Sequence, residues 1–133
     1  MTFRIALAIL AGSLTIALSA PVSAQTPADF TKFSEACLGA QTFLIGEVPE
    51  GTDPTTILTP LCACIVTAFA PLTQPEVDML AADLRGESTE ETHAAYTDYA
   101  ALENKARDGL TSCFSNPEIQ SLMPAAPAAP AAQ

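Results

Sequence analysis

Residues 59–70 read TPLCACIVTAFA, and this stretch decides the fold. No charged residue occurs anywhere between Asp53 and Glu76. On a helix, the apolar side chains of this stretch lie nearly all round the axis, which is the pattern of a central helix surrounded by others. Proline is tolerated only in the first turn of a helix, so Asp53-Pro54 can start a short turn and Thr59-Pro60 can start or restart the main helix. We therefore predict a buried helix over residues 54–70.

Two of the four cysteines lie inside this stretch. Cys62 and Cys64 are two residues apart, about 200° around the helix axis, so they point to nearly opposite sides. A bond between them would break the helix. Four cysteines in a small chain with an export signal predict a disulfide framework. Two pairings stay open: Cys37–Cys62 with Cys64–Cys113, or Cys37–Cys64 with Cys62–Cys113.

Three further helices are predicted around the central one, over residues 27–44, 74–85 and 89–114, because apolar residues recur in each at spacings of three and four. Capping boxes at residues 73–76 and 88–91 begin the last two. The stripe of the longest helix is Ala95, Tyr99, Leu102, Ala106, Leu110 and Cys113.

The cysteines also predict how these helices are arranged. Cys62 and Cys64 lie near the start of their helix, whereas Cys113 lies at the end of its own. A bridge between them sets the second and fourth helices antiparallel, and we expect the third to cross between them. The predicted fold class is therefore all-α, a small four-helix bundle held by disulfides over residues 25–116.

A Pro/Ala-rich tail is predicted over residues 117–133. Residues 124–133 repeat a three-residue unit of proline and alanine. Prolines at this spacing block a helix, and alanine supplies too little apolar area to fold, so we expect an extended, flexible end. A role as spacer or as ligand for a proline-recognising groove stays open.

Residues 1–24 have the features of a secretory signal peptide. Arg4 precedes an uncharged run with an apolar centre, and Val22 and Ala24 suit signal peptidase, which predicts cleavage between Ala24 and Gln25. We therefore expect a bacterial protein exported by the Sec pathway to the periplasm or the medium, with no membrane attachment after cleavage.

The chain is strongly acidic. Its net charge is −10 at pH 7, and loss of the single positive charge of Arg4 makes it −11. Binding of nucleic acid or anionic lipid depends on clustered lysine and arginine, so both are excluded as partners. The acidic stretches Glu47–Asp53 and Glu87–Glu91 are a candidate surface for a basic protein, although negative charge is also favoured beside helix starts.

The sequence predicts no enzyme, cofactor or metal ion. His93 is the only histidine, and it is expected at the surface. No serine elbow, histidine pair or glycine-rich phosphate loop accompanies it. Copper or zinc would need more ligands than His93, Met79 and Met123.

Three functions stay open. The leading one is a non-catalytic periplasmic binding or interaction module, because a disulfide-held scaffold and an acidic surface come without catalytic residues. The second is a thiol-redox or metal-handling protein that uses Cys62-Ala63-Cys64, although a reactive thiolate usually has a basic neighbour. The third is an acid-responsive periplasmic chaperone, because protonation of the carboxylates would abolish the negative charge.

Overall fold

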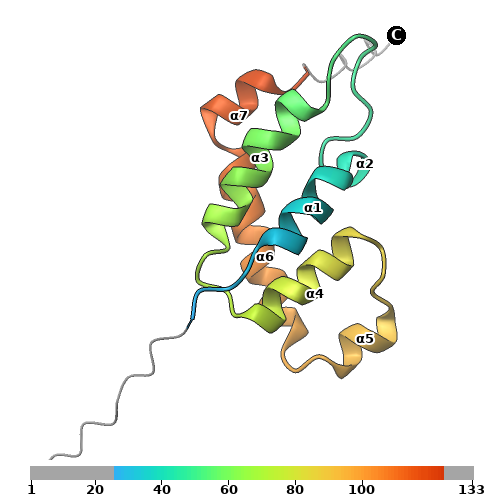
Figure 1. Cartoon of the computed structure of the whole chain (residues 1–133), viewed down its shortest axis with the longest axis vertical. Coiled ribbons are helices and arrows are strands. Elements are labelled where there is room, and N and C mark those ends of the chain that lie inside the picture. The colour runs from blue at the N-terminus through green and yellow to red at the C-terminus, as the bar shows by residue number, and fades with distance from the viewer. Residues whose placement is uncertain (1–25, 125–133) are drawn as a thin grey trace, which may run out of the picture.

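The computed structural model describes residues 26–124, so the predicted signal peptide, its cleavage site at Ala24 and Gln25, and the repeats after residue 124 lie outside the described residues. Between residues 26 and 124 the chain forms helices and no strand, which confirms the all-α class (Figure 1). The helices are α1 (Thr31–Gly39), α2 (Gln41–Leu44), α3 (Thr55–Ala68), α4 (Gln74–Leu84), α5 (Glu90–Ala95), α6 (Tyr99–Phe114) and α7 (Pro117–Leu122). None of these described helices has the length and apolarity that a membrane crossing requires.

α3 is the central helix, as predicted. The Asp53 carboxylate begins it by accepting hydrogen bonds from the Thr55 backbone N–H and hydroxyl, at 2.9 and 2.7 Å. The helix continues through Pro60 instead of restarting there. Its buried side chains lie within about 140° of the helix circumference, so one broad face is buried and not nearly the whole helix as expected: Ile57, Leu58, Leu61, Cys62 and Ile65.

Two disulfides hold α3 between its neighbours. Cys37–Cys62 joins it to α1, and Cys64–Cys113 joins it to α6, with Cα–Cα distances of 5.9 and 5.8 Å. This is the first of the two pairings that the sequence left open. α3 and α6 run antiparallel, as expected, but α4 has α1 as its main partner and does not fill the space between them (Figure 1).

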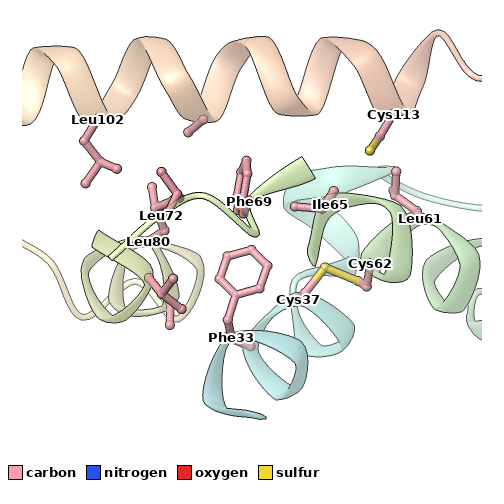
Figure 2. Close-up of a cluster of buried hydrophobic side chains, with 14 of the residues drawn as sticks. Phe33, Cys37, Leu61, Cys62, Ile65, Phe69, Leu72, Leu80, Leu102 and Cys113 are labelled. Atoms are coloured by element: carbon pink, nitrogen blue, oxygen red, sulfur yellow. A yellow bond between two sulfur atoms is a disulfide. The ribbon is translucent and has the colours of Figure 1, made fainter. Parts of the chain in front are cut away.

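The core lies where α1, α3, α4 and α6 meet (Figure 2). The ring of Phe69, at the end of α3, lies between α6 and the ring of Phe33. The two rings meet edge to face with their centroids 5.5 Å apart, a favourable geometry for aromatic pairs. Leu61 and Leu102 are fully buried on either side of this pair.

α3 and α6 approach each other closely at Gly109. A β-carbon on this glycine would lie 2.6 Å from Cε1 of Phe69 and 3.5 Å from the β-carbon of Ala68. The Phe69 ring is 3% exposed and rests on Phe33, so it has little room to shift. Glycine inside a helix is about 1 kcal/mol less favourable than alanine, so its place here follows from packing and not from helix formation.

We therefore expect Gly109→Ala to lower the free energy of unfolding by about 1–3 kcal/mol, the usual cost of overpacking. Urea denaturation measures it, with Gly39→Ala as the matched control, because nothing lies within 4 Å of a β-carbon there. Combining Gly109→Ala with Phe69→Leu should cost less than the sum of the two single changes. A stabilised Gly109→Ala protein would contradict the close approach.

The first predicted helix is shorter and divided. We expected it over residues 27–44, but α1 begins at Thr31 because the Asp29 carboxylate accepts hydrogen bonds from the Thr31 N–H and hydroxyl, at 2.9 and 2.7 Å. The chain breaks at Ala40, and α2 follows as a single short turn.

The predicted helix over residues 89–114 is also divided, into α5 and α6. Asp98, the residue before α6, has a φ of 67°, a left-handed conformation that aspartate tolerates better than most residues. In a straight helix His93 and Tyr99 would lie about 240° apart around the axis. The break instead lets their rings stack, with centroids 4.0 Å apart. Ala95, expected in the buried stripe, is exposed.

The expected start of the flexible tail at residue 117 is wrong, because α7 occupies residues Pro117–Leu122. The Asn116 side chain accepts a hydrogen bond of 2.9 Å from the Glu118 N–H and caps this helix. Ile119 is buried, and α7 packs on α3. The pair Asn116-Pro117 therefore follows the end of α6 and begins α7.

Candidate functional site

An apolar cleft of about 680 Å³ follows one face of α6, and we call it the α6 cleft. The volume lies within the range of about 300–1,000 Å³ that ligand pockets occupy. Four residues of α1, α3 and α4 line its inner part: Phe33, Ile65, Phe69 and Leu80. Its wall on α6 includes residues three or four positions apart: Tyr99, Glu103, Ala106, Leu110 and Phe114. Phe43 of α2 also lines the cleft and is 75% exposed.

Asp83, His93 and Tyr99 form a polar cluster in the lining of this cleft. One oxygen of the Asp83 carboxylate lies 2.8 Å from Nε2 of His93, and the other accepts a hydrogen bond of 3.0 Å from the Tyr99 hydroxyl. The three residues come from α4, α5 and α6. Because α5 buries no residue of its own, this cluster is a main link between α5 and the rest of the molecule.

The environment of Tyr99 keeps its hydroxyl protonated. The pKa of Tyr99 is raised from 10.0 to about 12, mainly by burial and further by the hydrogen bond donated to Asp83 and the negative charges of Asp83 and Glu103. Tyr99 is therefore a neutral hydrogen-bond donor at any physiological pH.

The two tyrosines allow a direct test of this pKa. In a Tyr96→Phe protein, phenolate absorbance reports Tyr99 alone, and we expect a midpoint near pH 12. Adding Asp83→Asn removes a nearby negative charge, so the midpoint should fall towards 10 but not reach it, because burial is the larger cause. A midpoint near 10 in the Tyr96→Phe protein, with helices intact by circular dichroism, would contradict this environment.

Most of the basic side chains already have acidic partners. Within residues 26–124, Arg107 pairs with Glu103 in the cleft at 2.8 Å, Arg85 pairs with Glu87 at 2.7 Å, and Lys105 pairs with Glu76 at 2.7 Å. That part of the chain holds four basic and all fifteen acidic residues, a net charge of 4 − 15 = −11. Carboxylates are therefore in large excess on the surface.

The structure separates the cysteines that formed the candidate thiol site. Cys62 and Cys64 are bonded to different helices, so they do not face each other as a dithiol pair. Both bridges contribute buried sulfur to the core, from Cys37, Cys62 and Cys113. The arrangement is that of structural cross-links.

The other candidate residues are not brought together. His93 is half-buried in the cluster and not a plain surface residue, Met79 packs against the core, and Met123 lies beyond α7. No group of three potential metal ligands from histidine, cysteine, aspartate and glutamate occurs in residues 26–124. The acidic stretch Glu47–Asp53 lies in the loop before α3, whereas Glu87–Glu91 lies at the start of α5, so the two are separate in the fold (Figure 1).

Comparison of the chain with protein-family models, with curated proteins and with solved structures finds no match.

Proposed function

We propose that this protein is a non-catalytic binding module of the bacterial periplasm or cell exterior, and that the α6 cleft is its binding site. The cleft carries the proposal: an apolar hollow of about 680 Å³ with a small group of polar side chains in its lining. This combination is typical of ligand-binding sites. Apolar surface that water can reach is also a common mark of interaction sites.

The disulfides support both parts of the proposal. They fix α1 and α6, which both contribute residues to the lining of the cleft, to the same helix α3. A cleft held open in this way loses little conformational freedom when it binds, which favours affinity. Two structural disulfides in a small domain also fit an oxidising compartment, in agreement with the signal peptide expected in residues 1–24.

An apolar dye tests the proposal. The mature protein, with both disulfides intact, should bind N-phenyl-1-naphthylamine saturably and increase its fluorescence. Leu110→Glu places a charge in the cleft wall and should weaken binding at least about tenfold, since a buried charge without a partner is costly. Leu122→Glu is the matched control, because Leu122 is exposed on α7 and does not line the cleft.

A second variant separates a loss of binding from a loss of folding. Phe43→Glu changes a residue that is mostly exposed, so the fold should tolerate it, and dye binding should still weaken. The proposal fails if the folded protein shows no saturable binding, or if Leu110→Glu and Phe43→Glu bind the dye as the unchanged protein does.

A further inference from the structure

We infer that the natural occupant of the α6 cleft is an amphipathic helix of a partner protein or peptide, with an apolar face and a cationic flank. This inference rests on the proposed function of the cleft as a binding site. Three features of the described residues support it: the length of the cleft, its exposed aromatic rim and its charge.

The cleft has the length of a helix. Its lining runs along α6 from Tyr99 to Ser115, and at a rise of 1.5 Å per residue this face extends over about 24 Å. α1 and α6 both pack on α3 but contact each other little, and the cleft is lined by residues of both. A helix of about 16 residues laid along α6 matches this space, as in other helix-in-groove complexes.

The rim of the cleft carries an apolar anchor that nothing in residues 26–124 covers. Phe43 stands at the edge with three quarters of its surface exposed, and the half-buried Leu44 and Phe114 also line the cleft. Aromatic side chains are enriched at protein interfaces, where they supply large contact area. An apolar helix face would cover Phe43 and the inner part of the cleft together.

The charge of the cleft and its surroundings favours a cationic partner. Asp83, Glu103 and Arg107 line the cleft, and because Glu103 and Arg107 pair with each other, the lining keeps one net negative charge, on Asp83. The described residues carry a net charge of −11 in all. A cationic helix is attracted to this surface over a distance and an anionic one is repelled, which sets both the rate and the choice of partner.

Designed peptides test the occupant. The first is an 18-residue helix, about the length of α6, with leucine at positions i, i+3, i+4 and i+7 and lysine elsewhere. The second has the same composition in shuffled order, without an apolar face, and the third has glutamate in place of lysine. Calorimetric titration into the mature, disulfide-bonded protein should show saturable binding of the first peptide at least about tenfold tighter than of the other two.

Variants of the protein locate the binding. Phe43→Ala should lower the affinity for the lysine peptide by about tenfold or more, as expected for an interface anchor. Leu122→Ala, exposed on α7 and outside the cleft, should leave the affinity unchanged. Glu103→Gln should weaken binding of the lysine peptide and reduce the salt dependence of this binding, because it removes a carboxylate from the cleft.

Each other outcome overturns the inference in its own way. If the lysine and glutamate peptides bind with equal affinity, charge does not select the partner. If the shuffled peptide binds as tightly as the amphipathic one, the attraction is electrostatic and does not use the cleft. Dye binding without peptide binding means a small apolar ligand, and the proposed function then stands while the inference falls. If the dye is excluded only at high protein concentration, the occupant of the cleft is a second copy of the chain. If the dye is excluded only in a precursor that keeps residues 1–24, the occupant is the leader of the same chain. Absence of both dye and peptide binding rejects the inference and the proposed function together.

Discussion

Replacing Cys64 and Cys113 by alanine is expected to lower the free energy of unfolding by about 4 kcal/mol. The bridge joins residues 49 positions apart, and a cross-link over a loop of this length removes much of the freedom of the unfolded chain. Domains of this size are stable by only about 5–15 kcal/mol, so the loss takes away a large share of the total. The bridge also holds α6 against α3, and with it one wall of the α6 cleft.

Urea denaturation of the double variant, followed by circular dichroism, measures this effect. The matched comparison is Cys37→Ala with Cys62→Ala, where the loop is 25 residues and the expected loss is about 3.5 kcal/mol. Treating the unchanged protein with a reductant should destabilise it by at least as much as either double variant. A loss below about 1 kcal/mol for Cys64 and Cys113 would show that packing alone holds α6 in place.

Leu61→Ala is expected to cost about 3–4 kcal/mol, within the range of about 2–5 kcal/mol that leucine-to-alanine changes cause in protein cores. Leu61 lies in the middle of the central helix with 0% of its surface exposed, next to the bridge from Cys62 (Figure 2). Truncation leaves a cavity in the core cluster to which Leu61 belongs. The cavity cannot collapse easily, because the two disulfides fix α3 to α1 and α6.

The control for this change is Leu122→Ala, the same substitution at a residue that is 43% exposed on α7. It should cost less than about 1 kcal/mol, since most of that side chain already contacts water. Both free energies come from the same urea experiment under oxidising conditions. Losses of similar size in the two proteins would mean that α3 is not the centre of the core.

The central helix and its cross-links were predictable because the signals for them are local. The uncharged run around residues 59–70 marks a buried helix, and the two-residue spacing of Cys62 and Cys64 sends their bridges to opposite sides. What the spacing leaves open is which partner lies on which side. That choice depends on how α1 and α6 are placed around α3, which is a property of the whole fold.

The divided helices and α7 were harder to predict, because contacts between distant residues decide them. The periodic pattern continues through residues 96–98, yet the stacking of His93 on Tyr99 and the bond to Asp83 favour a break there. Similarly, α7 has only six residues, and it is stabilised by burying Ile119 where it packs on α3.

The α6 cleft has no sequence signal that distinguishes it from core. Tyr99 and Leu110 recur at helical spacing and were read as a buried stripe, because the wall of an apolar cleft and the face of a core helix have the same periodicity. His93 looked like a surface residue beside two glutamates, and only the fold brings it to Asp83. Gly109 likewise gives no hint of the Phe69 ring above it.

The two disulfides arrange the backbone as two covalent rings that meet at Ala63, one running from Cys37 to Cys62 and the other from Cys64 to Cys113. A protease that cuts either ring once, for example in the loop before α3 or the loop before α5, opens that ring without releasing a fragment. Between Cys37 and Cys113, only the two peptide bonds of Ala63 would separate the chain when cut once, and both lie inside α3, where a protease cannot reach an extended backbone. The part of the chain between Cys37 and Cys113 therefore stays one covalent molecule after a single cut in either ring.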